Sequence, residues 1–335
     1  MSARPIPFYP VLRAREALGR GGDLASRLDR PGATRLSHAR AGLRLIAQAL
    51  GSGRVLVPDF LCASAVDPFA AAGLEVERYR IGPDLTADLD DLRARVGHGA
   101  RAAMMVSYFG LPQPIDEFSA ICREAGAVLI DDAAHSVLSD HAGRPYGTFG
   151  DAGVVSVRKT LATPDGAVLF GSLVPSADGL APDRPPSARY AVRTIARRAD
   201  AALRTDVLGR RARARSGALP DGAGPQEEER AGWSLITERV VRGAHVVDER
   251  ERRRRSFAAW NALLDGAGAE PIAAPTSPPG AGPSGFPVRV TDEERFARRM
   301  RELRVEWIRW PDRPEDSAEF PRGVGLLPTH TLPAE

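Results

Sequence analysis

The strongest constraint on the fold is a regular alternation of short apolar runs with helix-periodic segments between residues 43 and 171. In the first segment apolar residues recur at helical spacing, at Leu43, Ile46, Ala47 and Leu50, and the run RVLVP then has the length of a buried strand. The alternation continues through a helix near Ala63–Ala72 and through EVERYRI, DLDDLRARV, RAAMMVSYF, IDEFSAICREAG and AVLIDDA, and GVVSVR and AVLFGS add two strands. Strands that alternate with helices form mostly parallel sheets covered on both faces, so the sequence predicts an α/β fold.

The character of the sequence changes after Ser172. Residues 173–232 are rich in Pro, Gly and Arg and end in GALPDGAGPQEEER, which is typical of an irregular loop. A long helical segment from Trp233 to Leu264 is predicted next, and GFPVRV, DEERFARRMREL and VEWIRW then have the pattern of strand, helix and strand. We therefore predict a large α/β domain over residues 1–232, which includes the irregular 173–232 segment, and a smaller C-terminal α+β domain over residues 233–335.

Several classes of protein are disfavoured by the sequence. No apolar run approaches the roughly 20 residues that span a bilayer, and the N-terminal MSARPIPFYP lacks the continuous apolar stretch of a secretory signal. We therefore expect a cytoplasmic protein without a membrane partner. Cys62 and Cys122 form neither a metal-ligand spacing nor a disulfide framework, and the six histidines show no HxxxH arrangement, so no metal site is expected.

The net charge of +3 is mild for 335 residues. Arginine concentrates at Arg193–Arg215 and again at Arg252–Arg255. Such runs are either solvated helix faces or surfaces that attract an anionic substrate or polymer. We favour solvated faces and expect no nucleic-acid partner.

The candidate site residues are those that follow the predicted strands, because ligands of open α/β sheets bind beyond the carboxyl ends of the strands. Asp131 and Asp132 end one strand, and Ser156 and Lys159 end another. The helix that begins within Ser37–Leu43, with Ser37 as its expected N-cap, offers N–H groups to a phosphate. These three features together favour a site for pyridoxal phosphate.

Each residue type has a physical role in such a site. Lys159 is the only lysine among 46 lysine and arginine residues, and an amine forms a Schiff base with the cofactor aldehyde, which a guanidinium does not. A carboxylate pairs with the pyridine nitrogen and keeps it protonated. Only one of two adjacent carboxylates can face that nitrogen, and we expect Asp132, with Asp131 in a structural role.

The residues also resemble a known family. The segment AVLIDDAAHSVLSDHAGRPYGTFGDAGVVSVRKTLATPDGAVL is similar to the central signature of the DegT-type sugar aminotransferases, which are fold-type-I pyridoxal phosphate enzymes. VPDFLCASAVDPFAAAGLEVERYRI and VSYFGLPQPIDEFSAICREAGAVLIDDAAH extend the resemblance. It covers residues 35–172 well, and only the architecture is similar after residue 230. The resemblance implies a fold-type-I architecture with a large sheet domain and a smaller C-terminal domain.

The resemblance assigns roles residue by residue. It implies that Lys159 is the Schiff-base lysine, Asp132 the pyridinium partner and Ser156 a phosphate ligand. His135 stands where the family often has glutamine or histidine beside the phenolic oxygen of the cofactor. The alternative is a histidine at a helix start whose hydrogen bonds are satisfied there. The interval from Ser156 to Lys159 is three residues, whereas the family usually has five, so the local turn must differ.

Three further cofactor-binding residues are implied by the same comparison. The phosphate-binding pair of the family falls on Ala39 and Arg40, whose amides and guanidinium suit an anion. The position that commonly stacks an aromatic ring on the cofactor is Cys62, so either Phe60 supplies that face or the contact is smaller. The alternative for Cys62 is a small buried hydrophobic residue.

The implied activity is transamination from an amino acid, in this family often glutamate, to a keto-sugar that is usually nucleotide-linked. The alternatives are another outcome of the same cofactor chemistry, such as dehydration or racemisation, and a catalytically silent relative that acts as a regulator or binding protein. Relatives build each site at a dimer boundary, so the resemblance implies a homodimer, with residues 173–232 as the expected contact with the partner or substrate.

Overall fold

The computed structural model describes residues 6–10, 12, 19, 21–174, 232–272, 277–311, 320 and 323–331. Nearly all of the predicted irregular segment 173–232, including the arginines at 193–215, therefore lies outside the described residues. In the part of the chain that is described, no helix combines the length and the apolar character needed to cross a bilayer.

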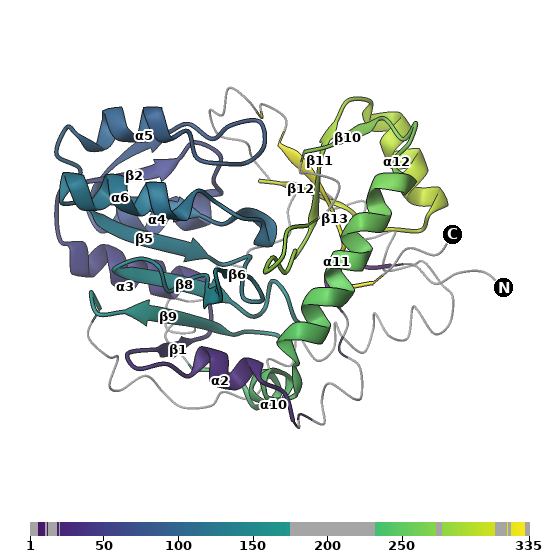
Figure 1. The fold of residues 1–335 in the computed structure, drawn as a ribbon, viewed down its shortest axis with the longest axis horizontal. Coiled ribbons are helices and arrows are strands. Elements are labelled where there is room, and N and C mark those ends of the chain that lie inside the picture. The colour runs from purple at the N-terminus through teal and green to yellow at the C-terminus, as the bar shows by residue number, and fades with distance from the viewer. Residues whose placement is uncertain are drawn as a thin grey trace.

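A seven-stranded sheet forms the centre of the larger part of the molecule (Figure 1). Its strands lie in the order β1 (Thr34–Leu36), β9 (Ala167–Gly171), β8 (Ala152–Ser156), β5 (Val128–Ala133), β4 (Ala102–Val106), β2 (Arg54–Pro58) and β3 (Glu75–Tyr79). The five strands from β8 to β3 pair in parallel, and β9 pairs antiparallel with both of its neighbours. The predicted mostly parallel α/β sheet is confirmed.

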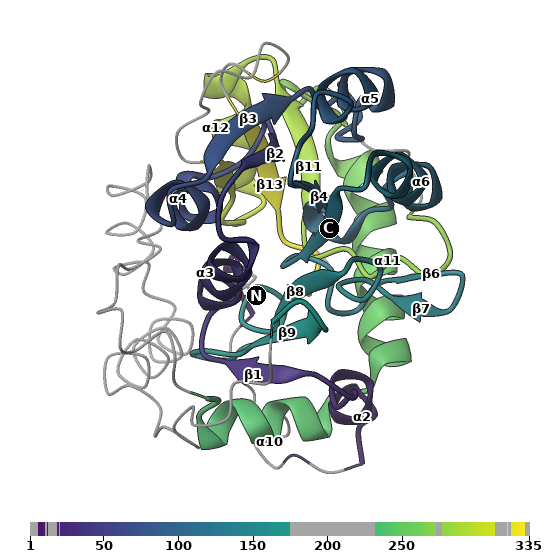
Figure 2. The ribbon, with the colours of Figure 1, turned by 90° about the vertical axis from the view of Figure 1, so that its left-hand side faces the viewer.

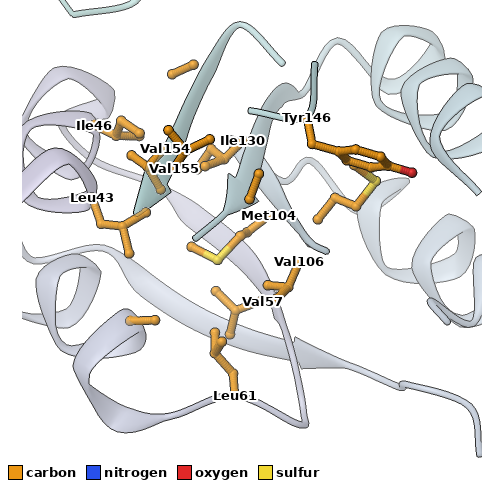
Figure 3. Close-up of a cluster of buried hydrophobic side chains, with 14 of the residues drawn as sticks. Leu43, Ile46, Val57, Leu61, Met104, Val106, Ile130, Tyr146, Val154 and Val155 are labelled. Atoms are coloured by element: carbon orange, nitrogen blue, oxygen red, sulfur yellow. The ribbon is translucent and has the colours of Figure 1, made fainter. Parts of the chain in front are cut away.

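Helices cover both faces of this sheet (Figure 2). One face carries α3 (Ala39–Leu50) and α4 (Ala63–Ala71), and the other carries α5 (Leu89–Val96) and α6 (Ile115–Ala125), while the short helix α2 (Leu24–Leu28) lies beside the β1 edge and the 3-10 helix η1 (Tyr108–Gly110) follows β4. The apolar stripe of α3 faces the sheet, so that Leu43 and Ile46 point toward Val154 of β8 in the core (Figure 3). This stripe is the helical periodicity seen in the sequence.

A second, four-stranded antiparallel sheet lies at the carboxyl end of the large sheet (Figure 1). Its order is β10 (Ala269–Pro271), β11 (Phe286–Val290), β13 (Val324–Leu327) and β12 (Ile308–Trp310), with α12 (Glu293–Glu302) packed on it. A separate apolar cluster holds it together and includes Phe257, Trp260, Phe286, Phe296 and Met300. The predicted strand, helix and strand correspond to β11, α12 and β12. A two-stranded hairpin is formed by β6 (Asp140–His141) and β7 (Arg144–Pro145).

The long helical segment predicted over Trp233–Leu264 is helical in the structure but is not a single helix. The structure has two helices, α10 (Leu235–Gly243) and α11 (Val246–Leu263), because the backbone is extended at Ala244 and His245. Hydrogen bonds from a distant segment hold this break: the Asp23 carboxylate accepts from Val246 N at 2.7 Å, and Asp23 N donates to the Ala244 carbonyl at 3.1 Å. The long helix α11 then runs from the large sheet to the small one (Figure 1).

The predicted domain boundary between residues 232 and 233 stays a prediction. Helix α10 packs beside α2, and its Val240 and Val241 belong to the apolar core of the large sheet. Ile6 belongs to the second cluster and hydrogen-bonds with its backbone to Arg304 and Glu306. The apolar core of the large sheet therefore includes residues of the predicted C-terminal domain, and the small-sheet cluster includes Ile6 of the predicted large domain.

Candidate active site

The start of α3 lies directly beside the turn that carries Lys159. The predicted N-cap, Ser37, is wrong by one residue, because the backbone of His38 is still extended (φ −141°, ψ 144°) and the helix begins at Ala39. The Ser37 carbonyl instead accepts a 2.8 Å hydrogen bond from Gly166 N. This bond joins the helix start to the end of the Lys159 turn.

The Lys159 turn is a compact loop between the antiparallel strands β8 and β9. Val157 N donates to the Gly166 carbonyl at 2.9 Å, and Thr160 N and Leu161 N both donate to the Val157 carbonyl. Gly166 has φ +115°, and a Cβ atom there would lie 2.8 Å from a methyl carbon of Thr237, so glycine fits this position. The three-residue interval between Ser156 and Lys159 thus forms a tight turn that places the lysine at the carboxyl end of the parallel strands.

The two adjacent aspartates occupy different environments. Asp131 is fully buried, and its Oδ2 accepts from Gly147 N at 2.7 Å and from Phe149 N at 3.1 Å. Burial raises the pKa of Asp131 to about 7, and its Oδ1 has no hydrogen-bond partner among the described residues. This carboxyl group holds the loop after β7.

Asp132 instead faces the lysine. It is 5% exposed, and its Oδ1 accepts from Ala134 N at 3.0 Å. Burial raises the pKa of Asp132, and the charge of Lys159 offsets part of that rise. Successive side chains of a strand point to opposite faces, which separates the two aspartates of β5.

The side chain of Lys159 contacts His135. Its Nζ lies 3.1 Å from His135 Nε2. Burial, and then the charge of Lys159, hold the pKa of His135 well below its usual range, so the imidazole is neutral at neutral pH. An ammonium group can only donate, so a charged Lys159 pairs with the tautomer in which Nε2 accepts and Nδ1 carries the ring proton.

All seven predicted site residues line one pocket, which holds about 640 Å³ of empty space including its open mouth. Asp132 and Ser156 lie in strands β5 and β8, His135 and Lys159 lie in the turns that follow those strands, and Ala39, Arg40 and Cys62 lie at helix starts. Their catalytic and cofactor-binding roles stay predictions.

The two residues considered for an aromatic face lie in different places. Cys62 is the N-cap residue of α4, and its Sγ lies 3.3 Å from Ser64 Oγ at the pocket wall. Phe60 does not line the pocket. Its ring is fully buried against Tyr108, Trp310 and Phe320. Of the two alternatives, only a smaller contact between Cys62 and the cofactor is compatible with these positions.

Sequence reasoning missed several pocket residues. His38 and Arg158 adjoin predicted site residues, and their position in the motifs is the signal that could have found them. Trp310 also lines the pocket, from β12 of the small sheet. No local pattern around Trp310 indicates this, because its place depends on how the two sheets pack.

The donor set fits pyridoxal phosphate. An amine and a buried carboxylate lie in the same pocket, as a Schiff base and a pyridinium nitrogen require. The first residues of α3 and the 3%-exposed Ser156 line the same wall, where helix N–H groups and a hydroxyl suit a phosphate. Nothing in this arrangement calls for a different cofactor.

Comparison with known proteins agrees with this geometry. The model of the DegT/DnrJ/EryC1/StrS aminotransferase family matches residues 23–172. Over 143 residues, 41% of this chain and 37% of the relative, the sequence is 30% identical to the dTDP-4-dehydro-2,3,6-trideoxy-D-glucose 4-aminotransferase of Saccharopolyspora spinosa. Over 146 residues, 42% of this chain and 40% of the relative, it is 29% identical to the GDP-perosamine synthase of Vibrio cholerae. The matched region thus spans about two fifths of either curated relative.

Solved structures extend the likeness of fold over nearly the whole chain. The sugar aminotransferase CalS13 from Micromonospora echinospora superimposes with a TM-score of 0.64 at 20% identity, covering 97% of this chain and 94% of CalS13. The chain therefore has the fold of the sugar aminotransferases.

Proposed function

We propose that the chain is a pyridoxal-phosphate-dependent aminotransferase, on the premise that residues 23–172 match the model of the DegT/DnrJ/EryC1/StrS aminotransferase family. The acceptor is a keto-sugar linked to a nucleotide, and the donor is an amino acid, glutamate in the first instance. The observation that carries the proposal is that the only lysine of the chain lies with a buried carboxylate in one pocket, 3.1 Å from a neutral imidazole.

The residues divide the work as follows. When bound, the cofactor acts as an electron sink for the substrate carbon that loses its proton. Lys159 would hold the cofactor through its amine and, as a neutral amine, would move the proton at that carbon. The Asp132 carboxylate would pair with the ring nitrogen, and His135 would serve the phenolic oxygen. Ser156 and the first turn of α3 would hold the phosphate.

The residue types on the pocket wall suit an anionic substrate. Arg40, Arg158 and Lys159 line the pocket together with the carboxylate of Asp132. Guanidinium and ammonium groups are the side chains that bind phosphate-bearing ligands in charge-assisted hydrogen bonds. The two named relatives are a dTDP-sugar aminotransferase and a GDP-perosamine synthase, and a nucleotide-linked sugar is the class that we assign here.

The test uses the single lysine. Borohydride reduction of the cofactor-loaded protein should attach the cofactor permanently to the peptide that contains Lys159. The yellow colour of the loaded protein should be absent in Lys159→Ala. Lys159→Arg is the matched control, because it keeps the positive charge and lacks the reactive amine. An unlabelled Lys159 peptide in a folded, yellow protein would refute the proposal.

The reaction type needs a separate measurement. With glutamate and a nucleotide-linked keto-sugar, the expected products are 2-oxoglutarate and the amino sugar in equal amounts. Dehydration or racemisation would leave the amino group of glutamate in place. The homodimer and the cytoplasmic location stay predictions, and sedimentation of the loaded protein tests the first.

A further inference from the structure

Trp310 stands apart from the other residues of the pocket wall. Those residues lie between His38 and Lys159 and belong to the large sheet and its helices, whereas Trp310 ends β12 of the small sheet. Strand β12 is an edge strand that pairs only with β13, with Trp310 opposite Val324. Among the residues that the structure describes, the small sheet therefore reaches the pocket wall through the indole ring of Trp310 alone.

The ring of Trp310 contacts the imidazole next to the lysine. The centroids of Trp310 and His135 are 5.6 Å apart, with the rings at 73°. On another side, Phe109 stacks on His135 at 5.2 Å and 23°, and Phe109 meets Trp310 edge-on at 5.2 Å and 87°. Offset-stacked and edge-on pairs of this kind have preferred geometries, so the two rings restrict the plane of the imidazole.

Phe109, the second ring that contacts His135, is also hydrogen-bonded to the segment before the small-sheet strand β11. Phe109 has φ 53°, which is disfavoured for a residue with a Cβ atom. Its carbonyl accepts a 2.7 Å hydrogen bond from Ser284 N, two residues before β11. At Gly110 a Cβ atom would lie 2.6 Å from the Gly282 carbonyl oxygen, so the two segments approach closely there. Contacts from β12 and from the approach to β11 thus meet at His135.

We propose that Trp310 is a positioning residue, which acts with Phe109 to hold the His135 ring so that its Nε2 faces Lys159. The packing of the small sheet against the large one then sets the geometry of the lysine and histidine pair. This inference rests on the proposed function only in treating Lys159 as the reacting amine, and its first readout needs no cofactor.

Among the described residues, few charged groups lie near His135. Lys159 contacts it, and Asp132 is the nearby carboxylate of β5. Arg158 lies on the same pocket wall. From the small sheet, Arg309 adjoins Trp310 but pairs with Glu293 at 2.9 Å. Tyr108 contacts the rings of both Phe109 and Trp310. Its hydroxyl donates to the Phe60 carbonyl at 2.6 Å, and burial raises the pKa of Tyr108 well above its usual range.

The experiment compares two tryptophans of the same segment. Trp310→Leu removes the indole from His135 and opens the ring to water, while Trp307→Leu is the matched control, because Trp307 packs on Phe296 at 4.9 Å inside the small-sheet cluster. NMR titration of the histidine rings in the cofactor-free protein, with the His135 signal assigned by His135→Gln, measures the pKa of His135 directly.

In Trp310→Leu the pKa of His135 should rise by about one unit or more, a tenfold change in proton binding. Trp310→Phe keeps a ring and should give a smaller rise, and Trp307→Leu should give none. In the loaded enzyme, the pH at which the visible absorption changes should shift in the same order, and kcat should fall more than KM changes.

Two results would overturn the proposal. One is an unchanged pKa of His135 in both Trp310 variants. The other is an equal shift in Trp307→Leu, which would reveal a general loosening. If Trp310→Leu does not fold, Trp310→Phe decides alone, because the proposal requires a rise there too. Failed labelling of Lys159 would remove the proposed function but would leave this titration result unaffected.

Discussion

The seven-stranded sheet and its helices bring all seven predicted site residues to one pocket, whereas in the described part of the chain the four-stranded sheet brings only Trp310. The first set comes from strand ends and helix starts, which the sheet topology alone gathers at one edge. The second depends on how two separately packed cores meet. The comparison teaches that reactive groups are placed by topology, while their orientation depends on packing between the sheets.

The largest effect is expected from a substitution in the site at the edge of the large sheet. Asp132→Asn removes the buried carboxylate beside Lys159 without changing the size of the side chain. We expect kcat/KM to fall by roughly 10²–10⁴-fold, in the range of losing one positioned acid or base, with the melting temperature little changed. A kinetic comparison with the wild type under saturating cofactor measures this, and near-normal turnover would exclude the pyridinium role.

The next largest effect is expected from a substitution in the contact between the two sheets. Arg253 of α11 is 1% exposed and donates to the carbonyl of Thr160, next to Lys159, and at 3.3 Å to the Thr329 hydroxyl. Arg253→Met should lower the free energy of unfolding by about 2–3 kcal/mol, because the buried Thr160 carbonyl and Thr329 hydroxyl lose their hydrogen-bond donor. Arg255→Met is the control, because Arg255 is 61% exposed and should matter by less than about 0.5 kcal/mol. Urea unfolding of both variants measures the difference.

A third measurement sharpens the contrast between the adjacent aspartates. The pKa of Asp131 is raised to about 7 in the folded protein, against about 3.9 in the unfolded chain. Between those values the folded state retains a proton that the unfolded state has released, so stability falls as pH rises from about 4 to about 7 and is level above that.

Asp131→Asn should flatten this dependence and leave turnover nearly unchanged. The amide oxygen can accept the two hydrogen bonds from Gly147 and Phe149, and the amide nitrogen takes the place of an oxygen that has no partner among the described residues. Thermal unfolding at several pH values checks the prediction. A loss of activity as large as in Asp132→Asn would contradict the separation of the two roles.

The smallest effect concerns the pocket wall at Cys62. Serine is a preferred N-cap residue and keeps a partner for Ser64, so Cys62→Ser should preserve the start of α4. We expect the dissociation constant of the cofactor to change by less than about fivefold, below roughly 1 kcal/mol. Equilibrium binding measured by absorbance tests this, and a much weaker complex would mean that the thiol packs directly on the cofactor.

The sequence predicted the part of the site that local patterns determine. Lys159 and Asp132 were found because strand ends can be seen in hydrophobic periodicity, and β5 and β8 are parallel neighbours. The break between α10 and α11 was missed, because hydrogen bonds from Asp23, more than 200 residues away, hold it. Trp310 was missed for the same reason, since its contacts with Phe109 and His135 join segments that no local signal connects.

The single lysine has a practical consequence for chemical biology. Lys159 is the only side chain of this sequence that carries an amine for acylating reagents, and it lies inside the pocket. Apart from the N-terminal amine, the rate of such labelling therefore reports how often the pocket is vacant. The same scarcity leaves the protein surface without side-chain anchor points for amine-directed crosslinkers, so attachment strategies must rely on other functional groups.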